Sequence, residues 1–207
     1  MKMPIMNDEY AELLGIMTGD GCLSHTGKAR YIYIAGHKQD DWEYHHNITK
    51  VLFQNLFSKE INIKERKNEN TLFIKFSDKV IFNELSKFIP VGKKYDSLEI
   101  PNMILKDASF FFAYVRGLVD TDGCIIFSKQ HRKTPYYPRI ELTSKSKPFL
   151  ISILSELKKH EFYGSVSHKG KSCYRLELPG FKNLKKYQEL IGFSNPTKRK
   201  KSAPSQI

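Results

Sequence analysis

The sequence has few cysteines and no long apolar run, and each shortage excludes a class of protein. Cys22, Cys124 and Cys173 are the only cysteines among 207 residues, and they form no CxxC pair. We therefore expect free thiols rather than a disulfide framework or a structural zinc site. No apolar segment approaches the roughly 18 residues of a membrane-spanning helix, and the N-terminal segment MKMPIMNDEY resembles no signal peptide. We expect a cytoplasmic protein that spans no membrane.

Acidic residues are also scarce relative to basic ones. The chain has 34 Lys and Arg against 22 Asp and Glu, which gives a formal net charge of +12. This excess favours a polyanionic partner such as nucleic acid. A basic surface that serves only solubility is the alternative, and charge alone does not decide between them.

A ten-residue segment occurs twice, about half the chain length apart. Residues 13–22 read LLGIMTGDGC, and residues 115–124 read VRGLVDTDGC. Both end in Asp-Gly-Cys after an apolar stretch with a glycine. The repetition predicts two copies of one structural unit.

The hydrophobic periodicity repeats with the motif. Each half reads as a helix, two strands, a helix, two strands and a closing helix. We therefore predict an α+β fold of two pseudo-symmetric αββαββα units with antiparallel sheets. The expected boundaries are 1–95 for the N-terminal half, 96–107 for a linker and 108–207 for the C-terminal half.

Small residues four apart predict that the two motif helices pack closely. Gly15 and Gly19 lie on one helix, and Gly117 and Thr121 lie on the other. A flat stripe of this kind lets two helix backbones approach each other, which explains glycines that cost up to roughly 1 kcal/mol each in a helix. If the helices run nearly parallel, their C-terminal ends meet.

The acids that follow these stripes, Asp20 and Asp122, are then expected side by side at two negative helix ends. Like charges and the helix dipoles raise the pKa of both carboxyls, and a bound divalent cation reverses that balance. Oxygen ligands without His or Cys favour Mg²⁺ over Zn²⁺. A metal beside a basic surface suggests phosphodiester hydrolysis. Gly21 and Gly123 as ordinary helix terminators would explain the glycines but not the paired acids.

Alternation along the strands predicts a polar outer face. Ile140 and Leu142 should face the helices, as should Tyr174, Leu176 and Leu178, while the residues between them face outward. Long basic and hydrogen-bonding side chains on one face suit a nucleic-acid groove, whereas the lysine-rich run 198–201 is expected to be mobile and to neutralise phosphates. The expected DNA contacts are Lys28, Arg30, Tyr31, Tyr33, Lys64, Arg66, Lys75, Lys129, Arg139, Glu141, His168, Lys169, Arg175 and Glu177.

The two motifs resemble the signature motifs of the LAGLIDADG homing endonucleases, in the single-chain form with two motifs. The resemblance covers nearly the whole chain and implies motif helices at the centre of a DNA-binding saddle. It also implies a monomer that cuts double-stranded DNA at long sites with Mg²⁺, for which Mn²⁺ substitutes, and leaves 3′ overhangs. An intron-encoded enzyme is the expected context.

The resemblance also implies roles for individual residues. Asp20 and Asp122 match the metal-binding acids, and the carbonyls of Gly19 and Thr121 match positions that add a metal ligand. Lys94, in preference to Lys93, and Lys198 match lysines near the active site, although both runs also read as basic surface.

One position departs from the family pattern. Where the family often has a glutamine, the chain offers His37 with Lys38, Ser144 with Lys145, or Gln39. Asp120 has no counterpart in the first motif, where Thr18 stands, and we expect it to make a structural contact.

Two other functions compete with cleavage. An RNA-splicing maturase on the same fold is the main alternative, and a nuclease-dead DNA-binding regulator is the second. Both acids of the motif are present, which favours the nuclease. The target sequence does not follow from these patterns.

Overall fold

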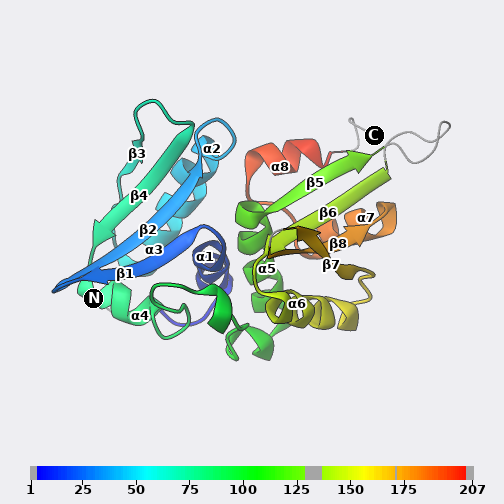
Figure 1. The fold of residues 1–207 in the computed structure, drawn as a ribbon, viewed down its shortest axis with the longest axis horizontal. Helices are drawn as coiled ribbons and strands as arrows, with labels where there is room; N and C mark the ends of the chain where they lie inside the picture. Colours follow the sequence, from blue (N-terminus) through cyan, green and yellow to red (C-terminus); the bar gives the residue numbers. More distant parts are fainter. Residues whose placement is uncertain (1–3, 129–136, 171, 204–207) are drawn as a thin grey trace.

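The computed structural model describes residues 4–128, 137–170 and 172–203. The chain forms two halves with the same order of elements, on either side of two central helices (Figure 1). The first half contains α1 (Asp8–Gly19), β1 (Gly21–Thr26), β2 (Ala29–His37), α2 (Trp42–Tyr44), α3 (Lys50–Phe57), β3 (Ile63–Glu65), β4 (Thr71–Ser77) and α4 (Lys79–Leu85). The second contains α5 (Ala108–Asp122), β5 (Gly123–Ser128), β6 (Tyr137–Ser144), α6 (Lys147–Lys159), β7 (Ser165–Gly170), β8 (Cys173–Pro179), α7 (Phe181–Leu190) and α8 (Pro196–Lys201).

Each half contains one four-stranded antiparallel sheet. The strand orders are β1-β2-β4-β3 and β5-β6-β8-β7, so the topology repeats. The registers repeat as well, since Gly21 lies opposite Ile34 in the first sheet and Gly123 lies opposite Leu142 in the second. The predicted α+β fold of two αββαββα units is confirmed.

The two motif helices, α1 and α5, pack against each other at the centre of the molecule. A Cβ atom added to Gly15 would lie 2.1 Å from the carbonyl oxygen of Tyr114, and one added to Gly117 would lie 2.2 Å from that of Glu12. The backbones therefore approach too closely for any side chain at either glycine. The predicted small-residue contact is confirmed.

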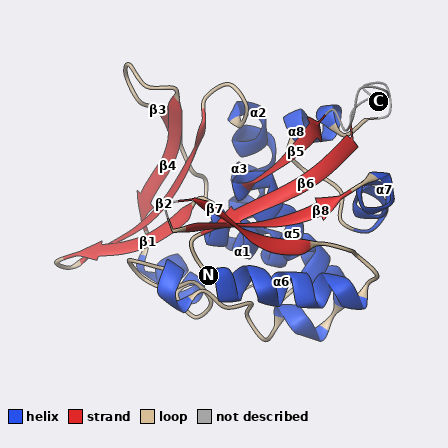
Figure 2. Cartoon of the chain, turned by 45° about the vertical axis from the view of Figure 1, so that its right-hand side comes forward, coloured by secondary structure: helices blue, strands red, loops and turns tan. Residues whose placement is uncertain are grey.

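The helix-facing side of each sheet forms the core. Alternate residues of the central strands point inward, as the period-two pattern predicts, and Figure 2 shows the helices (blue) packed along the strands (red). The inward residues of these strands are Ile32, Ile34, Leu72 and Ile74 in the first half and Ile140, Leu142, Leu176 and Leu178 in the second. The opposite face of each sheet is left open for polar and aromatic side chains.

Three features differ from the expectations or add to them. The middle helix of the first half passes through a π-helical turn, η1 (His45–Thr49), between α2 and α3. The segment between the halves contains short 3₁₀ turns at η2 (Tyr95–Ser97) and η3 (Ile104–Lys106). The expectation that run 198–201 is mobile was wrong, because these residues lie in α8, which Asn195 caps and Pro196 starts.

None of the helices described is long and apolar enough to cross a membrane.

Candidate active site

The C-terminal ends of α1 and α5 bring two carboxyls together. A Cβ atom on Gly19 would lie 2.0 Å from Thr121 Oγ1 and 3.6 Å from Asp122 Cγ, so the helix ends are in contact. Asp20 is the capping residue that follows α1, and Asp122 is the last residue of α5. The structure therefore places the two predicted metal-binding acids side by side.

Burial raises the pKa of both carboxyls, and the charge of Asp122 adds to the effect at Asp20. Burial, followed by the charge of Asp122, raises the pKa of Asp20 to about 7. Burial also raises the pKa of Asp122, against the opposing effect of Lys94 and Lys198. Ionised carboxylates are therefore unfavourable here unless a cation neutralises them.

The two predicted lysines lie at these same helix ends. Lys94 is buried, and its ammonium donates hydrogen bonds to the carbonyl oxygen of Gly19 and, at 2.7 Å, to that of Gly21. Lys198 donates to the carbonyl oxygens of Val119 and Asp120, both at 2.7 Å. Each ammonium thus meets the negative end of a helix dipole. The alternative candidate, Lys93, is exposed.

Burial lowers the pKa of both lysines, and the neighbouring carboxylates partly offset that effect. For Lys94 the opposing acids are Asp122 and Asp20, and for Lys198 they are headed by Asp120. The site is therefore a compact group of two carboxyls and two ammonium groups at the junction of the halves.

The donor set fits a hard divalent cation. Asp20 and Asp122 supply carboxylate oxygens, and the carbonyls of Gly19 and Thr121 lie beside them, although each also accepts a hydrogen bond from a lysine. Among the described residues, no group of three or more His, Cys, Asp or Glu side chains is placed to hold a metal. A cation such as Mg²⁺, which keeps several waters and binds substrate phosphate, needs only one or two carboxylates.

The comparisons with known proteins bear on the fold that carries these residues. Residues 109–192 match the family model of the LAGLIDADG-like domain. The second half is thus similar to a LAGLIDADG-like domain. The resemblance seen in the motifs is thereby confirmed, and the first half repeats the order of elements of this domain although it lies outside the match. No curated protein matches the chain at a significant level.

Solved structures share the fold of the whole chain. I-DmoI in complex with DNA and Mn is similar over 89% of this chain and 96% of its own, at 16% identity and a TM-score of 0.63. The homing endonuclease I-WcaI, bound to its DNA recognition sequence, is similar over 98% of this chain and 88% of its own, at 16% identity and a TM-score of 0.69. The N-terminal LAGLIDADG domain of DUF199/WhiA is similar over 92% of this chain and 87% of its own, at 18% identity and a TM-score of 0.57. These identities establish the fold alone.

The sheet of the first half has an aromatic and basic open face. Tyr33 stacks on Phe73 with ring centroids 6.0 Å apart, and the Lys75 ammonium lies 4.5 Å from the centre of the Tyr31 ring. Arg66 donates to the Tyr33 hydroxyl at 3.2 Å. Phe73 was missing from the predicted contacts, although its alternation with buried Leu72 and Ile74 would have placed it on this face. Lys64 lies opposite Phe73 in the register and shares the face.

The open face of the second sheet is a ladder of charges. Arg175 donates to Glu141 at 3.1 Å, and the Arg139 guanidinium approaches Glu177 at 3.5 Å. Lys169 lies 3.9 Å from Glu141. Glu141, expected to reach outward as a base contact, is only 1% exposed because these cations cover it. It is therefore an internal partner of Arg175 and not a free acceptor.

Of the four other predicted DNA contacts, two lie on the helix-facing side of a sheet. Arg30 is on the helix-facing side, where it donates to Asn83 at 2.7 Å, and His168 shares that side with Tyr174 in the second sheet. Neither side chain therefore lies on the open face that carries Tyr33, Lys75 and Arg175. Lys28 lies in the exposed turn between β1 and β2, and Lys129 lies outside the described residues.

The candidates for the family's glutamine position are dispersed. His37 lines a cavity of about 300 Å³ together with Thr121 and Lys198, whereas Gln39 is exposed. Lys38 pairs with Glu65. Ser144 accepts a hydrogen bond from the Ser146 amide, and Lys145 lies over the Tyr95 ring. His37 is therefore the candidate that shares a cavity with a lysine of the site.

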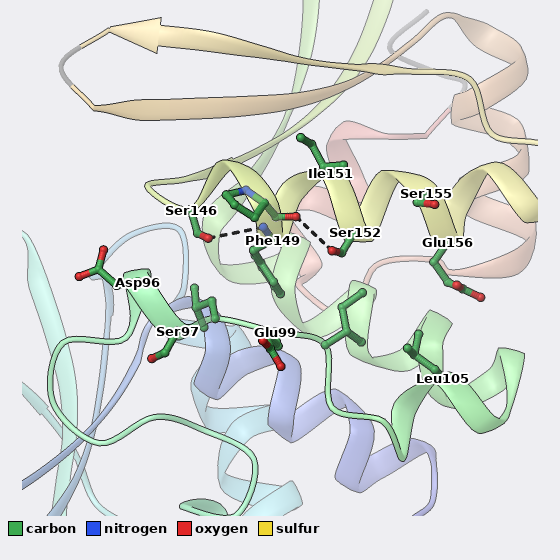
Figure 3. Close-up of a pocket in the computed structure, with 13 residues that line it drawn as sticks. Asp96, Ser97, Glu99, Leu105, Ser146, Phe149, Ile151, Ser152, Ser155 and Glu156 are labelled. Atoms are coloured by element: carbon green, nitrogen blue, oxygen red, sulfur yellow. Dashed lines mark hydrogen bonds between the residues drawn. The ribbon is translucent and has the colours of Figure 1, made fainter.

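A larger cavity of about 610 Å³ lies away from the aspartates, between the linker and α6. Figure 3 shows Asp96, Glu99 and Glu156 at its edge, with Leu105 and Ile151 exposed beside them. It shares no residue with the aspartate pair or the two lysines.

The raised pKa of Asp20 predicts a stability cost. Its pKa is about 7 in the folded chain and 3.8 in the unfolded reference, so ionisation favours unfolding, and the penalty grows from about pH 4 to about pH 7. Asp20→Asn should therefore stabilise the metal-free protein above pH 7, by up to about 4 kcal/mol, and have little effect near pH 4. Thermal unfolding at both pH values measures this. Asp96→Asn, at an exposed carboxyl, is the matched control, and a lower melting temperature for Asp20→Asn at pH 8 would contradict the argument.

Proposed function

We propose that the protein is a site-specific homing endonuclease that makes a staggered double-strand break in a long DNA target by metal-dependent phosphodiester hydrolysis. The observation that carries the proposal is the meeting of Asp20 and Asp122 at the ends of α1 and α5, between two sheets with open polar faces. We further propose that it acts as a monomer, because one chain contains both acids. As the family resemblance implies, we also propose that it is encoded in an intron and that the cut DNA ends carry 3′ overhangs.

The roles of the residues follow from their positions. Asp20 and Asp122, with the carbonyls of Gly19 and Thr121, would hold Mg²⁺ or Mn²⁺. When bound, the cation supplies a Lewis acid for the phosphate and activates water. Lys94 and Lys198 hold positive charge beside the carboxyls, where it would stabilise the charge that develops on the scissile phosphate. Their hydrogen bonds to helix-end carbonyls fix that charge in place before DNA arrives.

The open faces supply the proposed DNA-binding surface. The aromatic and basic face of the first sheet offers stacking and cation contacts, whereas the second offers guanidinium groups that suit guanine edges. The net charge of +12 favours association with the phosphate backbone. The maturase alternative is not favoured, because both acids are present and adjacent.

A single selection experiment tests cleavage and binding together. The protein is incubated with a randomised duplex library in Mg²⁺ or Ca²⁺, and the bound and the cut molecules are both sequenced. We expect a common site among the cut ends in Mg²⁺, with 3′ overhangs. Enrichment of a bound site without cut ends in Mg²⁺ and in Mn²⁺ would instead indicate a DNA-binding protein without nuclease activity.

The charge ladder on the second sheet predicts where sequence discrimination resides. Arg175→Ala should relax the preference at a few base pairs of one half-site, since a good bidentate contact is worth about 1 to 3 kcal/mol. Glu141→Gln should also relax this preference, although Glu141 itself contacts no base. The substitution removes the carboxylate charge that holds the Arg175 guanidinium in place. Cleavage profiling on single-base-pair variants of the target measures both.

Exposed lysines of α8 provide the contrast. Replacing Lys200 and Lys201 with alanine should weaken binding to all sequences and lower the salt slope by about one per lost phosphate contact. Unchanged base preference in Arg175→Ala and Glu141→Gln, with discrimination lost in the lysine variants, would show that recognition lies on the other surface.

A further inference from the structure

A buried asparagine joins the two halves beside Lys198. Asn195 is 1% exposed and precedes α8. Its Nδ2 donates to Asp41 Oδ1 of the first half at 2.9 Å, and its Oδ1 accepts from the Thr197 amide at 3.0 Å, which caps the helix. Thr197 Oγ1 also donates to the carbonyl oxygen of Asp40 at 3.0 Å. The loop that follows β2 therefore holds the start of α8.

Asp120 holds the same turn from the opposite side. Its Oδ2 accepts from the amides of Ser194 and Asn195, at 2.7 and 2.9 Å, and the side chain is fully buried. The structural contact expected of Asp120 is confirmed, and the group that Asp120 contacts is the backbone of this turn. We call Asp41, Asp120 and Asn195 the Asn195 network.

The network determines where the Lys198 ammonium lies. Lys198 is in the first turn of α8, three residues after Asn195, and the Ser202 amide at the end of the helix donates back to its carbonyl at 2.9 Å. The ammonium reaches the Val119 and Asp120 carbonyls from that turn. A shift of the turn would therefore move the ammonium away from the end of α5.

Lys94 is held in a different way. The Gly92 amide donates to the carbonyl oxygen of Leu23 at 2.7 Å, so the backbone of the first half itself holds the segment before Lys94. The counterpart of Asp120 is Thr18, whose hydroxyl donates to the Leu14 carbonyl of its own helix and accepts from the Tyr114 hydroxyl of the second half at 3.0 Å, so it does not hold the segment before Lys94. Among the described residues, no side chain of the second half hydrogen-bonds to residues 91–94. The two lysines thus differ in their dependence on the other half.

We infer that the Asn195 network positions Lys198 and not Lys94, so that the first half controls the cutting of one of the two DNA strands. The inference rests on the proposed nuclease function. Two acids and two lysines related by the internal repeat imply one cut in each strand, and only the cut assisted by Lys198 depends on the contact between Asp41 and Asn195. Asp41, Asp120 and Asn195 are positioning residues, because they act through Lys198.

The test measures the two strands separately. The target recovered from the library is labelled with a different fluorophore on each strand, and the cleavage rate of each strand is measured in Mg²⁺. Lys198→Met and Lys94→Met first identify the strand that depends on each lysine. Asn195→Asp keeps an acceptor for the helix cap but places a carboxylate against Asp41. Asp41→Asn leaves one acceptor oxygen for two donors, the Asn195 side-chain amide and the His37 backbone N–H.

We expect each single variant to slow the Lys198-dependent strand by about 10-fold or more and the other strand by less than about 3-fold, since small displacements at a reacting centre have effects of this size. Nicked DNA should accumulate. The double variant Asn195→Asp/Asp41→Asn restores a carboxylate–amide pair with the donor and acceptor exchanged, and it should recover the rate to within about 3-fold of the wild type.

The outcomes separate the inference from the proposed function. If the wild-type protein cuts neither strand, the nuclease proposal fails. If the wild type cuts and both strands slow equally in Asn195→Asp, or the double variant gives no recovery, the network has only a general structural role and the inference is overturned. Thermal unfolding of each variant shows that the rates belong to folded protein.

Discussion

Asp122→Asn is expected to abolish double-strand cleavage while the protein stays folded and binds its target, and Asp20→Asn should behave in the same way. Each substitution removes a carboxylate from the donor set for the cation, and a metal's contribution of several kcal/mol corresponds to a loss of at least about 100-fold in rate. Folding should survive because both carboxyls are destabilised by burial in the metal-free protein. The rate of each strand cut, with binding measured in Ca²⁺, checks the prediction.

The matched control is Asp96→Asn, which removes the same charge from the exposed linker. It should leave cleavage unchanged, so that a loss in the motif variants is not an effect of net charge. DNA binding by Asp20→Asn should be retained, because the change makes the surface more positive. A double variant that still cuts at the wild-type rate would remove these two acids from the mechanism.

The centre of the molecule was predictable because its constraints lie in the local sequence. Gly15 and Gly117 mark a close approach of two helices, and the repeat places Asp20 and Asp122 at equivalent ends, so the contact follows from spacing alone. Period-two alternation likewise identified the buried side of the central strands. These inferences needed no knowledge of distant contacts.

The surface was harder to predict because tertiary neighbours decide it. Alternation places Glu141 on the outer face correctly, but it does not show that Arg175 and Lys169 cover that carboxylate. Arg30 and His168 were expected to contact DNA as basic residues of the strand segments, although period-two alternation places both on the side of the core residues. Applying this alternation strictly would have placed both side chains on the core side of their sheets.

The α8 helix shows a second limit of sequence reasoning. A short segment rich in lysine reads as a mobile tail, and its helix depends on a cap from Asn195 and on hydrogen bonds from Asp120, which lies far away in the sequence. The signal that was available is the Asn-Pro pair that starts the helix. The contact between Asp41 and Asn195 had no comparable local signal.

Gly15→Ala and Gly117→Ala are expected to be among the most destabilising single substitutions in the chain. The added Cβ would lie 2.1 Å from the Tyr114 carbonyl oxygen at Gly15 and 2.2 Å from the Glu12 carbonyl oxygen at Gly117. Backbone atoms cannot move aside as a flexible side chain does, so α1 and α5 would have to separate. We expect a loss of about 3 kcal/mol or more, measured by denaturant unfolding.

Helix propensity makes the test stringent. Alanine is more favourable than glycine in a helix by up to about 1 kcal/mol, so any loss of stability must come from the contact between α1 and α5. Gly27→Ala is the comparison at an open site, because a Cβ there meets nothing within 4 Å and only its positive φ of 57° opposes the change. Separation of the helices would also move Asp20 away from Asp122, so a variant that stays folded should lose cleavage as well. Wild-type stability in both glycine variants would mean that α1 and α5 do not meet along this stripe, and the aspartate pair would then lose its structural basis.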